Sequence, residues 1–187
     1  MKTFVRKAVP GDASFSVPLI LEAIGDIAYR LTGETNKQAA ETALMKLFIR
    51  SDNRHSYRYT YIAEQSGTPA GILVLYFGTD AIELDLNLSS WLNEKKGIRI
   101  TLDREAHLDE WYIDTVCVHP DFRGSGIGTA LLTYAEYIAA EHEGSKLSLN
   151  VETKKEAAIR LYERNGFSIT QPWTIVGESF HHMVKYL

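Results

Sequence analysis

The stretch that decides the fold reads Val118-His119-Pro120-Asp121-Phe122-Arg123-Gly124-Ser125-Gly126-Ile127-Gly128-Thr129-Ala130-Leu131-Leu132. The run that leads into it, 110–118, is rich in aromatic and β-branched residues, a composition that favours a β-strand. The run that follows, 127–142, places apolar side chains on one face of a predicted helix. Three glycines within five positions therefore join a strand directly to a helix.

This glycine loop, Arg123–Thr129, has the composition of a phosphate cradle. Glycine permits positive φ and lets a ligand approach the main chain closely. The first turn of the following helix leaves N–H groups unpaired, and the helix dipole favours an anion there. Arg123 adds a charged donor at the rim. Taken alone, the glycines are equally typical of a tight turn without a ligand.

Two familiar phosphate-binding loops fit this stretch poorly. A P-loop ends in Gly-Lys-Ser/Thr, whereas Thr129 follows Gly128 here without a lysine. A dinucleotide fingerprint requires a third glycine where Thr129 stands, and it normally lies earlier in a chain.

Away from the glycine loop, the sequence pattern predicts a mixed α/β fold. Strands are expected at 4–8, 147–151, 167–170 and 180–186, with an antiparallel hairpin of 57–64 and 70–77 around Gly67. Helices are expected at about 14–31 and after capping boxes at Thr35–Gln38 and Thr153–Glu156. Strands 110–118 and 147–151 should be parallel neighbours with a right-handed crossover. We interpret 78–108 as a helix-bearing insertion in a single domain, 1–187.

Composition excludes several classes of protein. The 187 residues are 45% hydrophobic and 24% charged, an ordinary globular mix. A net charge of −4 without a basic face argues against nucleic acid as a partner and is compatible with a cationic substrate. Cys117, the single cysteine, excludes an internal disulfide framework. We find neither a signal peptide nor an apolar membrane span, so a cytoplasmic protein is expected.

Two motifs in order resemble the GCN5-related N-acetyltransferase (GNAT) superfamily. The glycine loop is similar to its acyl-CoA-binding motif, Arg/Gln-x-x-Gly-x-Gly/Ala after a strand. Ala158-Ile159-Arg160-Leu161-Tyr162-Glu163-Arg164-Asn165-Gly166-Phe167 looks like its second element, and Arg6–Ala13 like its first strand and turn. The resemblance is close over Glu110–Phe167 and loose elsewhere. The chain departs from it at Lys155, where the family often has asparagine.

The resemblance implies acetyl-CoA (coenzyme A) as co-substrate and direct attack by an amine in a ternary complex. No metal is expected, because the residues show no metal-ligand spacing. It implies cofactor contacts from Val116, Val118, Arg123, Gly124, Ser125, Gly126, Ile127, Gly128 and Thr129. The expected partner is an amine acceptor, with no nucleic acid and no membrane, and a homodimer is left open. An acyl-CoA-binding sensor or interaction module without turnover is the alternative function, and a longer acyl chain is not excluded.

Tyr162 is the candidate general acid for the leaving thiolate. On the residues alone, a core tyrosine on a helical stripe is the more usual interpretation. The resemblance favours the catalytic one, because Tyr162 stands where the family places its acid.

The candidate bases lie on the strand 110–118. Alternation puts Glu110, Tyr112, Asp114, Val116 and Val118 on one face and Trp111, Ile113, Thr115 and Cys117 on the other. A carboxylate inside an apolar strand is unusual. The resemblance implies that Asp114 is a candidate base, because it lies nine residues before Arg123, where some family members place one; otherwise it pairs with a nearby basic side chain. Glu110, at the strand's edge, could act through water or bind a cationic amine. Cys117 is predicted to be a buried small hydrophobe, and His181 and His182 receive no role.

Overall fold

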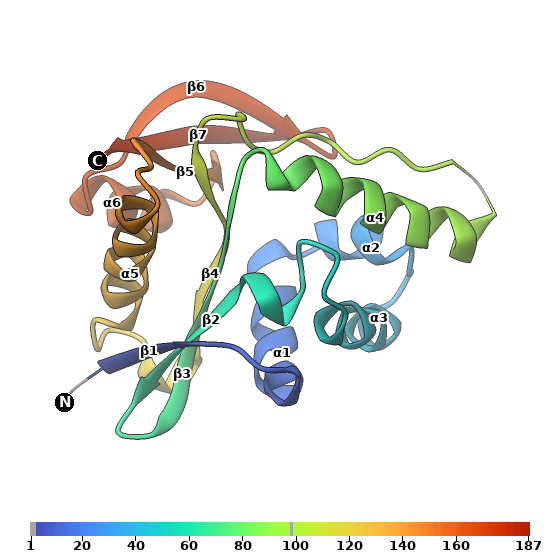
Figure 1. Cartoon of the computed structure of the whole chain (residues 1–187), viewed down its shortest axis with the longest axis horizontal. Coiled ribbons are helices and arrows are strands. Elements are labelled where there is room, and N and C mark those ends of the chain that lie inside the picture. The colour runs from blue at the N-terminus through green and yellow to red at the C-terminus, as the bar shows by residue number, and fades with distance from the viewer. Residues whose placement is uncertain (1–2, 98) are drawn as a thin grey trace.

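The computed structural model describes residues 3–97 and 99–187, and these form one seven-stranded mixed sheet ordered β1-β2-β3-β4-β5-β7-β6 (Figure 1). The strands are β1 Thr3–Lys7, β2 Thr60–Gln65, β3 Thr68–Phe77, β4 Trp111–Val118, β5 Lys146–Glu152, β6 Ser168–Ile175 and β7 Glu178–Tyr186. The helices are α1 Ala13–Ile24, α2 Ile27–Thr32, α3 Lys37–Ile49, α4 Asp80–Lys96, α5 Ile127–Glu141 and α6 Glu156–Arg164. The mixed α/β class and the parallel β4–β5 pair predicted from the sequence are confirmed.

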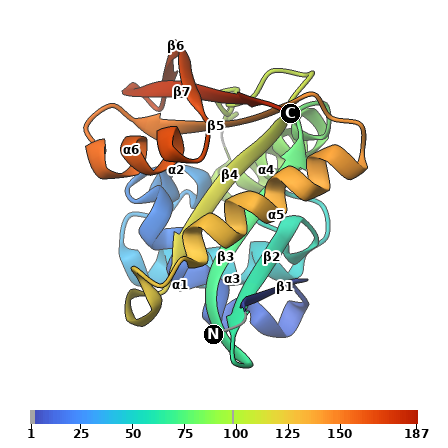
Figure 2. The ribbon, with the colours of Figure 1, turned by 90° about the vertical axis from the view of Figure 1, so that its left-hand side faces the viewer.

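Helices cover both faces of the sheet. The apolar sides of α1, α2, α3 and α4 pack together on one face, against Ile62 and Ile72 of β2 and β3. On the other face, α5 buries Leu131 and Ala135 against strand residues such as Leu149. Figure 2 shows α5 lying across the sheet with α6 beside the β5–β7 end. The core therefore has two layers, with β4 between them.

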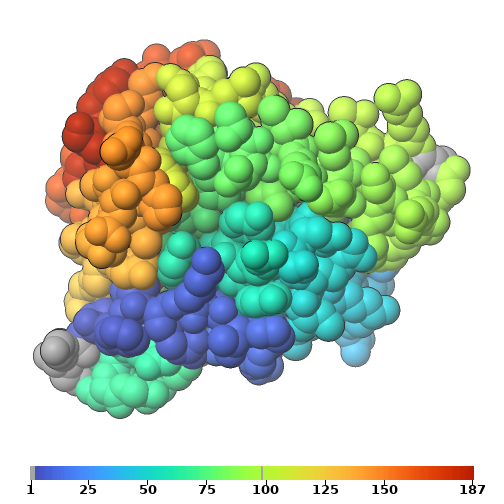
Figure 3. Space-filling view, in the orientation of Figure 1, coloured from blue at the N-terminus to red at the C-terminus, as the bar shows by residue number. Residues whose placement is uncertain are grey.

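Residues 78–108 contain α4 and a long extended segment. Leu84, Leu88 and Leu92 form the buried stripe of α4, and the helix ends at Gly97 with φ of 67°. The space-filling view shows α4 and the chain after it forming a continuous surface with α3 (Figure 3). Within the described parts of the chain, no helix combines the length and apolarity needed to cross a membrane.

Three helix predictions were wrong in detail: one predicted helix is divided in two, and two helices have N-cap residues other than the predicted ones. The helix expected over 14–31 is two helices, because Gly25 adopts a positive φ of 55° and ends α1. α3 is capped by Asn36, whose side chain accepts a hydrogen bond from the Ala39 N–H at 2.9 Å, rather than by Thr35. α6 is preceded by Lys155 as its N-cap, with no side-chain cap from Thr153.

The parallel pairing between β4 and β5 is short. It joins Trp111, Tyr112 and Ile113 to Leu147, Ser148 and Leu149. Beyond Ile113, β4 continues along β3 while β5 continues along β7. The two strands therefore separate and leave the outer edge of β4 open towards the glycine loop.

A β-bulge at Asp114 alters which face each β4 side chain takes. Val74 pairs with Thr115 and Leu75 with Ile113, so Asp114 is left without a partner in β3. A bulge shifts the alternation by one residue and re-aims the side chain. As a result, Val116 and Val118 pack on the α5 face with Ile113, and Cys117 packs on the opposite face. The simple alternation predicted for 110–118 is therefore wrong beyond Ile113.

His55 lies in the turn between α3 and β2 and is fully buried. Neither ring nitrogen has a hydrogen-bond partner among the described residues. Burial disfavours the imidazolium and lowers the pKa of His55 from 6.5 to about 4, although nearby Asp114 opposes the shift. The ring is therefore neutral in the folded protein at neutral pH.

This burial predicts a loss of stability in acid. Between pH 6.5 and about 4 the unfolded chain binds a proton at His55 that the folded chain does not. The free energy of unfolding should therefore fall by about 2 kcal/mol between pH 7 and pH 5 through this residue. Urea titrations at pH 7 and pH 5 measure this fall in the wild-type protein and in His55→Leu. The variant should lose less stability, because it lacks the titrating group. Equal losses in the two proteins would contradict the prediction.

Candidate active site

The glycine loop has the geometry of an anion site. Gly124 and Gly126 adopt φ of 75° and 87°, values that favour glycine, and a Cβ built on either meets nothing within 4 Å. Gly126 is the N-cap of α5, and its carbonyl accepts a hydrogen bond from the Ala130 N–H. By helix geometry, the N–H groups of the first turn before Ala130 lack intrahelical partners. Open space therefore lies in front of free donors at a helix N-terminus, which suits a phosphate group.

A cavity of about 470 Å³ opens over this loop. Its lining comprises Val116, Cys117, Val118, Phe122, Arg123, Gly124, Gly126, Ile127, Gly128, Thr129, Ala158, Leu161 and Tyr162. We call it the loop cavity. Every residue predicted to contact the cofactor lines this cavity except Ser125. The Ser125 hydroxyl donates a hydrogen bond to the Phe122 carbonyl.

The Arg123 guanidinium contacts other groups of the protein in this structure. Its Nε donates to the Val118 carbonyl at 3.2 Å, and its Nη2 pairs with Glu22 of α1. Both side chains of that pair are about half exposed, and exposed ion pairs contribute roughly 0–1 kcal/mol. The arginine can therefore exchange Glu22 for another anion at little cost. Lys155, exposed at the start of α6, pairs in the same way with Glu152 at 2.6 Å.

A second cavity, of about 330 Å³, adjoins the first. We call it the deep cavity. Its apolar wall includes Ile24, Ile27, Leu31, Ile175 and Phe180, and its polar wall includes Glu22, Arg54, Glu105, Tyr112, Asp114, Asn150, Glu152 and Lys155. Four residues line both cavities: Val116, Cys117, Ala158 and Tyr162. The two spaces therefore meet where β4 and α6 face each other.

Tyr162 lies at this junction. Its ring packs edge-on against Phe167, with centroids 6.1 Å apart, and the side chain is partly buried. Burial raises the pKa of the Tyr162 phenol to about 12. The hydroxyl is therefore protonated at neutral pH, as a general acid must be.

Cys117 also lies at the junction, on the same cavity as Asp114 rather than on the face predicted from alternation. Burial raises the pKa of its thiol to about 11. A thiol that holds its proton at neutral pH is a poor nucleophile. The prediction that Cys117 is buried is wrong, because its side chain is only partly buried and lines both cavities.

A buried charge cluster forms the end of the deep cavity. Arg54, with a side chain 1% exposed, donates through Nε and Nη2 to Asp85 of α4 at 2.9 and 3.1 Å. Its Nη1 lies 2.5 Å from Glu105 and 3.7 Å from Asp114. Three carboxylates thus surround one guanidinium, and two of the three line the cavity.

The position of Asp114 bears on both interpretations offered by the sequence, and its role as a base stays a prediction. It faces the deep cavity, and it lies near a basic side chain, Arg54. Its oxygens accept hydrogen bonds from the Tyr76 hydroxyl at 2.6 Å and the Thr115 hydroxyl at 2.9 Å. The bulge in β4 is what turns this carboxylate into the cavity.

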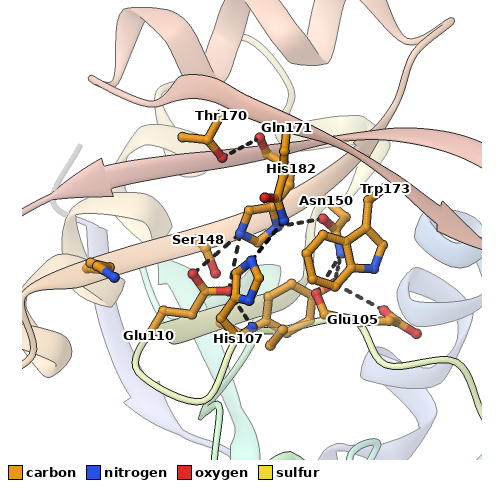
Figure 4. A network of polar contacts seen from close by, with 12 residues as sticks. Glu105, His107, Glu110, Ser148, Asn150, Thr170, Gln171, Trp173 and His182 are labelled. Carbon is orange, nitrogen blue, oxygen red and sulfur yellow. Dashed lines mark hydrogen bonds and ion pairs between the residues drawn. The ribbon is translucent and has the colours of Figure 1, made fainter.

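Glu110 is placed differently from Asp114. It is fully buried and belongs to the lining of neither cavity. Its carboxylate accepts the His107 N–H at 2.8 Å and contacts Nε2 of His182 (Figure 4). Burial raises the pKa of Glu110, but the hydrogen bonds with His182 and His107 outweigh it and leave the pKa below its usual value. The structure therefore separates the two carboxylates that alternation placed on one face.

The sequence did not single out several residues of the deep cavity, among them Arg54 and Glu105. Arg54 lies in the turn after α3, and Glu105 lies in the extended segment after α4. Neither stands in a motif, and 51 positions separate them in the chain. Only the tertiary contact between them reveals the cluster.

Comparison with solved structures supports the fold. An acetyltransferase crystal structure matches with a TM-score of 0.77 and 28% identity, covering 98% of each chain. An N-acetyltransferase from Staphylococcus aureus Mu50 matches with a TM-score of 0.80 and 23% identity over 97% of this chain and 99% of that one. The PaiA N-acetyltransferase from Thermoplasma acidophilum, solved with coenzyme A, matches with a TM-score of 0.60 and 16% identity over the whole of both chains.

No curated protein matches the chain by sequence. The family model of the acetyltransferase (GNAT) family does match it, over residues 26–167. That range contains the glycine loop, β4, β5 and α6, whereas α1, β6 and β7, which also line the deep cavity, lie outside it. The resemblance noted in the two sequence motifs is therefore confirmed, and the chain belongs to the acetyltransferase (GNAT) family.

Proposed function

We propose that this protein transfers an acetyl group from acetyl-CoA to a primary amine by direct attack in a ternary complex. The observation that carries the proposal is the meeting of two cavities at Tyr162. One cavity has free helix N–H donors for a pyrophosphate, and the other has buried carboxylates for an amine. Two substrates bound side by side can react without a covalent enzyme intermediate.

The residues of the loop cavity fit coenzyme A. The glycine loop and the first turn of α5 would bind the pyrophosphate through main-chain N–H groups. The edge of β4 left open beyond Ile113 would accept the amide groups of the pantetheine arm. Acetyl-CoA supplies the reactive thioester when bound.

The chain's own groups supply the proton transfers. Asp114, in the deep cavity, would take a proton from the acceptor nitrogen, and Tyr162 would donate one to the leaving sulfur. The raised pKa of Tyr162 keeps its proton available until the thiolate forms.

Thiol release separates this function from that of a sensor. Purified protein with acetyl-CoA and a panel of primary amines should release coenzyme A, and mass spectrometry should detect the acetylated amine. Binding of acetyl-CoA without thiol release for any amine would favour the sensor and reject the proposed enzyme.

Gly126→Asp should weaken coenzyme A binding. The substitution adds a negative charge at the α5 N-terminus and places a non-glycine residue at a φ of 87°. We expect a loss of affinity of about tenfold or more by calorimetry, equivalent to about 1.4 kcal/mol.

Gly67→Asp is the matched control, because Gly67 in the β2–β3 hairpin also has a positive φ of 80° and open space around it. Gly67→Asp adds the same charge and similar strain at a residue that does not line the loop cavity. Unchanged affinity in a folded Gly126→Asp protein would reject the glycine loop as the pyrophosphate site.

Asp114→Asn should slow turnover about tenfold, since the amide cannot accept the amine's proton. The loss should grow as the pH falls, because more of a basic acceptor is then protonated. Rates of thiol release between pH 6 and pH 9 measure it. The control is Asp109→Asn, which alters an exposed carboxylate paired with Lys146. A wild-type rate for Asp114→Asn would assign the base role to Glu110 or to water.

A further inference from the structure

His182 lines neither cavity and occupies the centre of a buried polar network (Figure 4). It lies on β7, in register with Asn150 on β5 and Gln171 on β6. Its side chain is 1% exposed. Trp173 packs on the ring with centroids 4.8 Å apart. The proposed chemistry leaves this residue without a role.

Both ring nitrogens of His182 face hydrogen-bond acceptors. Nδ1 lies 2.8 Å from Asn150 Oδ1, and Nε2 lies 3.2 and 3.3 Å from the two oxygens of Glu110. The orientation of the Asn150 amide is set by its other end, where Nδ2 donates to the Glu105 carbonyl at 2.7 Å. An oxygen acceptor on each side is satisfied when both nitrogens donate. The ring therefore links Asn150 on the Nδ1 side to the Glu110 carboxylate on the Nε2 side.

From His182 the donors all point in one direction. His182 Nδ1 is hydrogen-bonded to Asn150 Oδ1, and Asn150 Nδ2 donates to the Tyr112 hydroxyl at 3.2 Å. Tyr112 in turn donates to Glu105 Oε2 at 3.0 Å. Hydrogen bonds in such a chain polarise one another. The chain begins at the buried contact between His182 and Glu110 and ends on the Glu105 carboxylate, which lines the deep cavity.

The main chain around Glu105 is held by the same strands. We call residues 103–107 the strap. Trp173 Nε1 donates to the Arg104 carbonyl at 2.8 Å, and the Val176 N–H donates to Asp103 at 2.7 Å. Together with the bond from Asn150 to the Glu105 carbonyl, these contacts fix the strap across the end of the deep cavity.

The charges around Glu105 favour a cation in the cavity. Arg54 uses Nε and Nη2 on Asp85, which leaves Nη1 to face both Glu105 and Asp114. Two carboxylates on the cavity side therefore share one donor nitrogen. Burial raises the pKa of Glu105, with Arg54 opposing the shift and Asp114 and Asp85 adding to it. An ammonium placed beside Glu105 would offset this excess of buried negative charge.

We propose that Glu105 binds the ammonium of the acceptor and that His182, through Asn150 and Tyr112, is the positioning residue that holds this carboxylate in place. The proposal rests on the deep cavity being the acceptor site of the proposed function. It names the acceptor class as a small organic cation, because the cavity of about 330 Å³ has one apolar wall and one acidic end. The acceptor nitrogen would then lose its proton to the neighbouring Asp114.

Amine binding in the presence of saturating coenzyme A tests the proposal without turnover. The probes are 2-phenylethylamine, 1,4-diaminobutane and the uncharged 2-phenylethanol, measured by calorimetry. We expect both amines to bind more tightly than the alcohol. Glu105→Gln should weaken amine binding about tenfold, and Tyr112→Phe and His182→Gln should weaken it about fivefold each. Coenzyme A affinity should not change.

The double variants carry the decisive comparison. In the Glu105→Gln background, Tyr112→Phe and His182→Gln should cause no further loss, because they act through Glu105. Tyr134→Phe on α5, packed against Tyr61 away from the network, is the control. Tyr112→Phe leaves the Glu110–His182 pair whole, so it tests the chain even where a His182 variant fails to fold.

The outcomes separate this inference from the proposed enzyme. Losses that add in the double variants would overturn the positioning role, and wild-type amine affinity in Glu105→Gln would overturn the binding role. Failure of both amines to bind the wild-type protein would overturn the whole inference. Amine binding without thiol release would reject the enzyme while these variants still test Glu105.

Discussion

Arg54→Met is expected to lower the free energy of unfolding by about 3–5 kcal/mol at pH 7, the usual effect of removing one partner from a buried ion pair. The variant leaves Asp85, Glu105 and Asp114 buried around an uncharged side chain. Burial raises the pKa of Asp85 and of Glu105, and Arg54 opposes both shifts. Without Arg54, these two carboxyl groups would bind protons more readily in the folded chain than in the unfolded one, so stability should return as the pH falls below 7. Urea titrations at pH 7 and pH 5 measure both effects.

Arg50→Met is the matched control, four residues earlier in the chain. Arg50 pairs with Asp52 at 2.6 Å, but both side chains are about 40% exposed. Removing an exposed pair should change stability by less than about 1 kcal/mol at either pH. Similar small losses in the two variants would show that the Arg54 cluster is hydrated rather than a buried charge centre.

Tyr162→Phe is expected to reduce turnover by roughly 10²-fold, equivalent to about 2.7 kcal/mol of transition-state stabilisation, while the affinity for acetyl-CoA changes little. The substitution removes the phenolic proton and keeps the ring, so the edge-on contact with Phe167 survives. The raised pKa of about 12 means that no other protonation state of Tyr162 complicates the comparison near neutral pH. Single-turnover thiol release and calorimetry with coenzyme A separate the two parameters.

Tyr137→Phe, which alters an exposed tyrosine of α5, should leave turnover unchanged. A folded Tyr162→Phe protein with the wild-type rate would identify the tyrosine as a packing residue. If Asp114→Asn also had no effect, positioning of the two substrates would account for the catalysis.

The order of elements could be predicted because local pattern determined it. The strand before the glycine loop, the amphipathic α5 and the second family motif are each encoded within a few consecutive residues. The parallel β4–β5 pair followed from the crossover rule. Errors arose where one residue changed the geometry, as Gly25 does in ending α1.

The acceptor side could not be predicted in the same way. The bulge at Asp114 is a property of the β3–β4 pairing, and no residue type in 110–118 predicts it. The proposed role of Glu105 depends on its contacts with Arg54, Tyr112 and Asn150, which come from three separate parts of the chain. Such clusters depend on tertiary contacts, whereas the glycine loop depends on its own backbone.

The early separation of β4 from β5 gives a central strand the open hydrogen-bonding edge that proteins usually cover. On the proposed function, the pantetheine arm would occupy that edge and act as a removable strand. A ligand that binds only the folded chain adds stability in proportion to the logarithm of its concentration. The amount of acetyl-CoA in the surroundings would then govern the lifetime of the enzyme against proteolysis, in addition to its rate.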